Sequence, residues 1–570
     1  MEYISLCPLS LREPGDKSSA ILPLAFTTPL SKLLKIPVKF RPSEAMSEDK
    51  ATPDQHVKQV FDSEHVSGRA GTLLVATHFD KSTLGLHDID KVDTNAVASL
   101  KTTPDGQTVL IPQPTNDPEQ PLNWSWGRKH KVLLLLVYCT LMTDLTSAWE
   151  IPLVIPQAEY WHITPSNAGR NLSGNIFMLA VGGVLAVPLT RWVGRLPVIF
   201  WSMFFGFCMT IFATTAPTWI SFIVARCLQG LFITTPQVVG LSMIHDMFFF
   251  HERARKIGIW AATFIFSPFA GPFLSGIMVN FTNWRKSMWL NTGLVGLGLG
   301  LVSLFGEETV YRPTEAQGRK SGLVGQTMQL TGVNGYRSYT GGVESVVRDM
   351  AVMLTRPHFV GLCVFYMLTF MWSIGLNATL TLFVGPPPPA GYGYSDLKVA
   401  LLYISPMLAS MIGELFGHWF NDFIANRSIR RSGGAYEAEV RLWMLWISLP
   451  FLIAGLVFFG FALKDRLSWV SLCFAWGFYQ FGMVTATVAI TAYALDIFPD
   501  HSVEAAAILN AFRGMGGFIV NYFQVEWAHS FGPQNSFGVE AGIVGGAVVV
   551  AVLVQIFGRR WRTQFPAPTR

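Results

Sequence analysis

The feature that most constrains this chain is a series of twelve apolar windows, each close to the length of a membrane-spanning helix. They lie at about 131–155, 170–190, 196–216, 219–243, 256–280, 288–306, 358–384, 398–420, 442–463, 468–494, 503–524 and 536–558. A transmembrane helix needs about 20 mostly apolar residues to cross about 30 Å of hydrocarbon. Only 14% of the 570 residues are charged, against about 25% in soluble domains. The sequence therefore predicts an all-α membrane protein with twelve transmembrane helices.

The polar segments between and around these windows predict the organisation of the chain. Residues 307–357 form a long polar connection between the sixth and seventh windows, so we expect two six-helix halves, 128–306 and 358–562. Residues 1–127 are polar and aperiodic after the first part, which predicts a disordered cytosolic tail. Residues 563–570 are expected to form a short cytosolic tail. The stretch before Met46 does not resemble a signal peptide, and we interpret it as an extension or a gene-model artefact.

The distribution of lysine and arginine predicts the orientation in the membrane. Loops on the cytosolic side carry an excess of these residues. With a cytosolic N-terminus, the basic clusters 128–131, 191–195, 253–256, 427–431 and 559–562 all fall on the inner side. The loop between the tenth and eleventh windows is the exception, because it is acidic. Both termini are therefore expected in the cytosol.

Several other functional classes lack support in the sequence. The six cysteines show no CxxC spacing, and no HExxH pattern is present, so neither a metal site nor another cofactor is predicted. No GxxxxGK[ST] loop is present for ATP-driven transport. The net charge of +5 is modest and is accounted for by the inner loops, so nucleic acid is not an expected partner.

Four segments in a fixed order carry a resemblance to a known family. They read DPEQPLNWSWGRKHK before the first window, DMFFFHERARKIG after the fourth, GHWFNDFIANR after the eighth and FRGMGGFIVNYFQVEW in the eleventh. Across residues 118–562 the chain resembles the major facilitator superfamily, and within it fungal members near the twelve-span drug:proton antiporters. The resemblance implies a monomeric secondary transporter with alternating access, whose partners are a small-molecule substrate and the proton.

The loop between the second and third windows resembles the gating motif of that family. PLTRWVGRLP matches at Gly194 and Arg195, whereas Arg191 stands where the family has an acid. In the family this loop latches the inner gate, so any latch here must use other partners, such as acids of the second half. A degenerate copy in the second half places Asp422 in the acidic position. The alternative is that these arginines only anchor the loop on the positive side.

Two further motifs bear on coupling and direction. RCLQG in the fourth window matches the family motif at Arg226 and Gln229; there the arginine is linked to proton coupling, and the alternative is a cross-link between helices. SPFAGPFLSG in the fifth window resembles the antiporter motif Gly-Pro-x-x-Gly-Gly, with Ser275 in place of one glycine. The residues concerned are Pro268, Gly271, Pro272 and Gly276. Because lipid excludes an exposed loop, we expect a kinked helix here. The motif favours export over import, unless the kink serves packing alone.

Ionisable side chains within the windows are the candidates for proton and substrate binding, because they are costly in hydrocarbon. They are Asp144, Glu150, Glu414, His418 and Arg513, with Asn510 one turn from Arg513. We predict that Asp144 and Glu414 carry protons and that Arg226 and Arg513 are their counter-charges. Glu150 is expected nearer the outer rim. The alternative is a set of static ion pairs.

These observations lead to one functional hypothesis and two alternatives. The first is a proton-coupled exporter of a small organic molecule, a drug or fungal metabolite, in the plasma membrane or the vacuolar membrane. The second is uptake of a nutrient such as a polyamine or vitamin, and the third is a non-transporting membrane sensor. Sequons at Asn171 and Asn280 predict glycosylation near the outer face.

Overall fold

The computed structural model describes residues 101, 112–311, 323–333, 342–388, 391–431 and 437–568. All of them belong to one unit of the chain, residues 64–570. Most of the predicted N-terminal tail and parts of the central connection lie outside the described residues, so those predictions are not addressed. Among the described residues, regular secondary structure is helical throughout.

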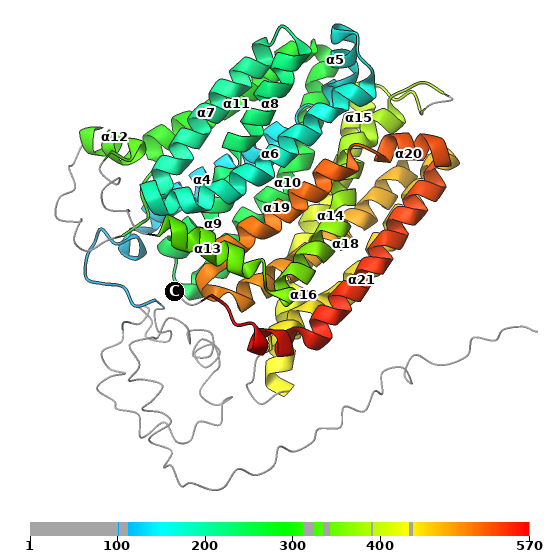
Figure 1. The fold of residues 1–570 in the computed structure, drawn as a ribbon. Helices are drawn as coiled ribbons and strands as arrows, with labels where there is room; N and C mark the ends of the chain where they lie inside the picture. The colour runs from blue at the N-terminus through cyan, green and yellow to red at the C-terminus, as the bar shows by residue number, and fades with distance from the viewer. Residues whose placement is uncertain are drawn as a thin grey trace, which may run out of the picture. The chain divides into compact units, whose positions relative to one another are not determined.

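The first six spans are built from the helices between residues 126 and 305 (Figure 1). Their bounds are α4 (Trp126–Ala148), η3 (Ile151–Leu153), α5 (Val154–Trp161), α6 (Pro165–Val193), α7 (Arg195–Thr215), α8 (Trp219–Ile233), α9 (Thr235–Met247), α10 (Phe250–Phe281) and α11 (Trp284–Phe305). A short η2 (Pro121–Asn123) precedes them. Within this half α4 packs on α10, and α8 packs on both α6 and α7.

The last six spans follow two short helices of the central connection, α12 (Leu323–Thr331) and α13 (Val343–Met353). Their bounds are α14 (Pro357–Val384), α15 (Asp396–Leu402), α16 (Ile404–Arg431), η5 (Ala438–Met444), α17 (Leu445–Lys464), α18 (Trp469–Ile497), η6 (Pro499–His501), α19 (Ser502–Val520), α20 (Gln524–Phe531) and α21 (Pro533–Gln564). Here α18 packs on α16 and α17, and α21 on α14 and α17. The prediction of twelve transmembrane helices is confirmed.

Three spans are interrupted where the windows suggested continuous helices. The first is divided into α4, η3 and α5, the fourth into α8 and α9, and the eighth into α15 and α16. Pro152 lies in η3 and Pro236 near the start of α9, and proline tolerates the first turn of a helix but removes a donor within one. The interruptions leave backbone carbonyl groups inside the bundle without helical donors. Those at the end of α4 accept hydrogen bonds from Arg226, as described below.

The two halves meet along a boundary at which α6 packs on α19 and α10 packs on α15 and α16 (Figure 1). Because the number of spans is even, α4 begins and α21 ends at the same end of the bundle. We call this end, with Trp126, Arg195 and Gln564, the terminal face, and the end with α5 and α20 the far face.

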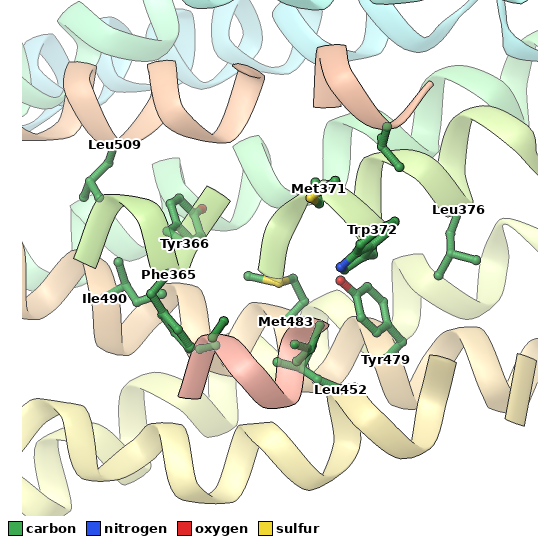
Figure 2. Close-up of a cluster of buried hydrophobic side chains, with 14 of the residues drawn as sticks. Phe365, Tyr366, Met371, Trp372, Leu376, Leu452, Tyr479, Met483, Ile490 and Leu509 are labelled. Carbon is green, nitrogen blue, oxygen red and sulfur yellow. The ribbon is translucent and has the colours of Figure 1, made fainter. Parts of the chain in front are cut away.

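A large apolar cluster stabilises the second half (Figure 2). Figure 2 shows Trp372 of α14 and Tyr479 of α18 pointing toward each other, with Met483 and Leu452 beside them. Tyr479 donates a hydrogen bond to the carbonyl of Thr369 at 2.6 Å, which satisfies its hydroxyl inside the cluster. The second half therefore has a closely packed apolar core.

The fifth span is helical from Phe250 to Phe281 and includes both Pro268 and Pro272, as predicted. A Cβ added at Gly271 would clash with the carbonyl oxygen of Leu145 in α4. The small residue therefore lets two backbones approach closely, which is how helices associate in lipid.

Replacing Gly271 by alanine is expected to destabilise the protein by about 1–3 kcal/mol, because backbone atoms of α4 must shift. The matched control is Gly258→Ala on the same helix, where an added Cβ meets no described atom within 4 Å. Thermal unfolding of the purified variants in detergent checks this: Gly271→Ala should melt well below wild type and Gly258→Ala should not. Equal melting temperatures would contradict the close approach.

Candidate functional site

Two adjoining pockets lie between the halves. The larger has a volume of about 290 Å³ and is lined by α9 and α10 of the first half and by α14, α16, η5, α18 and α19 of the second. The smaller, about 70 Å³, is lined by Asp144 and residues of α6, α10, α14, α18 and α19. Four residues line both pockets: Phe264, Ile265, Thr487 and Arg513. A pocket at the boundary of two repeated halves is the usual place for a transport site.

The wall common to the two pockets carries an ion pair that joins the halves. Arg513 Nη2 of α19 lies 3.5 Å from Asp144 Oδ2 of α4, and both residues are buried. Gln237 Nε2 of α9 donates to the same carboxylate oxygen at 3.0 Å. The Arg513 guanidinium also lies 4.3 Å from the ring centroid of Phe264. The structure thus brings together Asp144 and Arg513 as the predicted charge and counter-charge.

The second predicted carboxylate has a different environment. Glu414 Oε1 of α16 forms a hydrogen bond of 2.9 Å with Nε2 of His418, which lies one turn further along the helix. Its other oxygen, Oε2, is buried without a hydrogen-bond partner in the described part of the chain. Among the described residues, no arginine or lysine forms an ion pair with it. Arg226 is therefore not its counter-charge, since that arginine lies elsewhere in the bundle.

Asn510 faces the larger pocket with unused hydrogen-bonding groups. It is 9% exposed, and neither its Oδ1 nor its Nδ2 has a hydrogen-bond partner within the described ranges. Leaving a buried amide unpaired costs about 1–3 kcal/mol. The Asn510 amide, unpaired beside a cavity, is therefore positioned to bind a ligand or water.

Arg226 and Glu150 form a separate buried centre in the first half. Arg226 Nη1 and Nη2 donate to the carbonyls of Thr146 and Ser147 at 3.1 and 2.6 Å. These carbonyls belong to the last turn of α4, which lacks its own donors because the helix ends at Ala148. The Arg226 Nε atom lies 3.9 Å from Glu150 Oε1.

The position of Glu150 corrects the sequence prediction of a rim location. Its side chain is fully buried, and Gln157 Nε2 donates to its Oε2 at 2.5 Å. Since α4 ends at Ala148, Glu150 lies beyond the helix, and its carboxylate is near Arg226 of α8. Gln229 accepts a hydrogen bond from Arg226 and donates to Thr210 Oγ1 at 2.6 Å. The RCLQG motif therefore cross-links helices here, and its role in coupling stays a prediction.

The gating loop of the first half lies at the terminal face. Gly194 has a φ of 105°, which favours glycine, and Arg195 begins α7 and pairs with Asp246 of α9. Arg191 of α6 lies 3.8 Å from Glu504 of α19, so an acid of the second half supplies the partner that the motif lacks.

Other contacts order the same face. Glu308 Oε2 accepts from the backbone nitrogen of Leu196 at 3.0 Å, which places a carboxylate at the start of α7. Arg253 donates to the carbonyl of His245 at 2.9 Å. Burial lowers the pKa of Arg253 to about 10, so it remains protonated at neutral pH.

The second half has a corresponding charge cluster that the sequence only partly predicted. Arg441 Nη1 lies 2.9 Å from Asp422 Oδ1, and Arg441 Nε lies 3.0 Å from Asp496 Oδ2. Asp422 was expected from the motif copy. The sequence analysis missed Arg441, because it lies in η5, outside any motif. The only sequence signal for it is its position beside an apolar window, where an arginine is costly.

The span-five motif lies at the boundary between halves, toward the far face. A Cβ added at Gly276 would lie 2.8 Å from the Cβ of Ala400 in α15. The carbonyl of Pro268 accepts from Asn377 Nδ2 of α14 at 3.1 Å. Ser275, which replaces a glycine of the motif, donates to the carbonyl of Trp149 at 2.6 Å. The motif thus contacts the other half and the broken end of α4.

The two sequons differ in accessibility. Asn280 is exposed at the end of α10, so its glycosylation stays a prediction. Asn171 is fully buried in α6, and its Nδ2 donates to the carbonyl of Ala168 at 2.7 Å. The folded structure has no room for a glycan there, which argues against the prediction at Asn171. The sequon pattern does not reveal which face of the helix carries the asparagine.

Metal binding has no structural support in the described residues, where no group of three or more His, Cys, Asp or Glu side chains is placed to hold an ion. The pockets instead combine a few charged groups with aromatic and aliphatic walls. This combination is typical of sites for small organic molecules.

Comparison with known proteins extends these observations. The family model described as Major Facilitator Superfamily matches residues 134–521. The MFS transporter cpaT of Aspergillus oryzae is 25% identical over 459 residues, which cover 78% of this chain and 90% of that protein. The MFS-type transporter hepF of Aspergillus oryzae is 26% identical over 428 residues, covering 71% and 84%.

Solved structures show the same fold. The partially occluded inward open structure of the xylose transporter XylE from E. coli aligns with a TM-score of 0.53 and 14% identity, covering 76% of this chain and 98% of that one. At this identity the likeness concerns the fold alone. The family match spans most of both six-helix halves and includes the residues of the inter-half pockets. The chain therefore belongs to the major facilitator superfamily of membrane transporters.

Proposed function

We propose that this protein is a proton-coupled antiporter that exports a small organic molecule by alternating access. The observation that carries the proposal is the buried ion pair between Asp144 and Arg513, which joins the two halves at the pocket. A proton that binds Asp144 removes one charge of this pair and weakens the link between the halves. Such a carboxylate converts proton binding into a change in the stability of one conformation.

The contacts at the two faces support a pocket that reaches the terminal face. On the far face the halves are in close contact, through Gly276 against Ala400 and through Arg170, which lies 3.7 Å from Glu526. On the terminal face the larger pocket extends to Asp422 and Arg441. The Arg191–Glu504 pair is one of the contacts across the halves that would have to break for wider opening on this side.

Direction and location rest on sequence features. The basic terminal-face loops support a cytosolic location of that face by the positive-inside rule, and the span-five motif favours export. The fungal relatives cpaT and hepF are named as transporters without a substrate. We place the protein in the plasma membrane, with the vacuolar membrane as the second possibility. Uptake of a small nutrient is the alternative function, because the same pair serves a symporter equally well.

Flux in reconstituted vesicles tests the proposal. Ethidium is a suitable probe because it is aromatic and permanently charged, so a pH gradient alone does not trap it. Antiport should accumulate the dye in the acidic compartment at a rate well above that of protein-free vesicles. Accumulation in the alkaline compartment would support uptake instead. Binding without movement would support the sensor and overturn the transport proposal.

A further inference from the structure

The two pockets show which class of substrate they accept, an inference that deepens the proposed transport function and rests on it. The starting observation is an imbalance of charge. Four carboxylates line the pockets, those of Asp144, Glu414, Asp422 and Asp496, against the two guanidinium groups of Arg441 and Arg513. The lining carries a formal excess of two negative charges when His418 is neutral and of one when His418 is protonated.

With His418 neutral, the existing ion pairs leave one uncompensated carboxylate charge at Glu414 and one at the Asp422–Asp496 pair. Arg513 is committed to Asp144, and Arg441 is shared between Asp422 and Asp496. Glu414 has only the imidazole of His418 as a partner. A buried carboxylate without a full counter-charge is unfavourable, so a cation that enters the pocket gains the missing pairing.

The unused hydrogen-bonding atoms point to the same chemistry. Glu414 Oε2 is an acceptor without a partner among the described residues. Gln237 Oε1 is a second acceptor without a partner among the described residues. This atom is the oxygen of the amide, because the nitrogen Nε2 donates to the Asp144 carboxylate. Asn510 Oδ1 is a third unpaired acceptor among the described residues. A ligand that supplies N–H donors can satisfy all three acceptors.

The remaining wall is aromatic and suits the body of such a ligand. Trp260, Phe264 and Tyr366 line the larger pocket, and the Trp260 and Phe264 rings stack with centroids 6.3 Å apart. Trp260 Nε1 already donates to Thr140 Oγ1 at 3.0 Å, so its ring is held in place. Aromatic faces attract cations as well as apolar groups.

We propose that the cavity of this protein binds an organic cation, namely a protonated amine. The ammonium group lies at Glu414, and the apolar or aromatic body of the ligand packs against Trp260 and Phe264. The volume of about 290 Å³ fits a small molecule rather than a peptide. Anionic substrates are disfavoured, because they would add to the negative excess.

Equilibrium binding to the purified full chain in lipid nanodiscs, without any gradient, tests this class. The probes are 2-phenylethylamine, 2-phenylethanol and phenylacetate, which share a skeleton and differ in charge at neutral pH. The amine should bind at least tenfold more tightly than the other two. Equal affinities, tighter binding of phenylacetate, or no amine binding at millimolar concentration would overturn the proposal.

Variants locate the charge. Glu414→Gln should weaken amine binding at least tenfold and leave binding of the alcohol unchanged, which also shows that the variant is folded. Asn510→Leu loses no hydrogen bond of the described structure and should weaken amine binding severalfold. The control Glu159→Gln removes the same charge from the exposed end of α5 and should have no effect. Unchanged amine affinity in both pocket variants would contradict the site.

Binding and flux measured together distinguish the substrate-class proposal from the transport proposal. Binding of the amine without gradient-driven flux would keep the substrate class and refute proton-coupled export. Gradient-driven flux of ethidium together with equal binding of 2-phenylethylamine and 2-phenylethanol would keep transport and refute the protonated-amine site at Glu414.

Discussion

Replacing Arg226 by leucine is expected to destabilise the protein by about 3–5 kcal/mol, the typical result of removing one member of a buried ion pair. The loss has two sources. Glu150 would remain buried without its cation, and the carbonyls of Thr146 and Ser147 would lose their donors at the end of α4. Thermal unfolding of purified variants in detergent measures the effect.

A second substitution separates these sources. Adding Glu150→Gln to Arg226→Leu removes the uncompensated carboxylate, so the double variant should be more stable than Arg226→Leu alone although it carries one change more. If the double variant is no more stable than the single one, Glu150 is not the partner on which Arg226 acts.

Arg285 offers a matched control. Its guanidinium donates to the carbonyls of Thr214 and Ala216 at 2.8 and 3.1 Å, at the end of α7, but it is only half-buried and no acid pairs with it among the described contacts. Arg285→Leu should therefore cost about 1–2 kcal/mol, the value of the lost hydrogen bonds. Equal losses at Arg226 and Arg285 would show that burial of Glu150 contributes nothing.

Hydrophobicity along the chain was sufficient to predict the spans, because the cost of exposing polar backbone to lipid applies to every residue of a span. The same cost made charged residues within spans recognisable as site candidates. It also indicated that Asp144 needs a counter-charge, and Arg513, 369 positions away, provides it. These predictions depend on composition and not on the exact path of the helices.

The predictions that failed depend on that path. Glu150 was placed at the rim on the assumption of a continuous helix, but α4 ends at Ala148 and the Glu150 side chain is fully buried. Asn171 was judged by its sequon, although its face of α6 is buried. The role of Gln237 in holding Asp144 was missed, because an uncharged amide in an apolar window gives no signal before the fold is known.

The last expected result concerns the pair that joins the halves. Asp144→Asn should abolish the ability of a pH gradient to accumulate substrate. One pH unit corresponds to about 1.4 kcal/mol per proton, and therefore to about a tenfold concentration ratio for one-to-one exchange. Wild-type vesicles should approach this ratio for ethidium in the acidic compartment, whereas vesicles with Asp144→Asn should reach equal concentrations on the two sides.

Two controls make this outcome specific to the carboxylate. Asp144→Glu keeps a titratable group in the pocket and should retain part of the accumulation. Asp465→Asn removes a carboxylate from the exposed end of α17 and should accumulate ethidium as wild type does. Full accumulation by Asp144→Asn would move proton coupling away from the Asp144–Arg513 pair. Glu414, the other buried carboxylate of the pocket, would then be the group to test, because it is 5% exposed and no arginine among the described residues neutralises it.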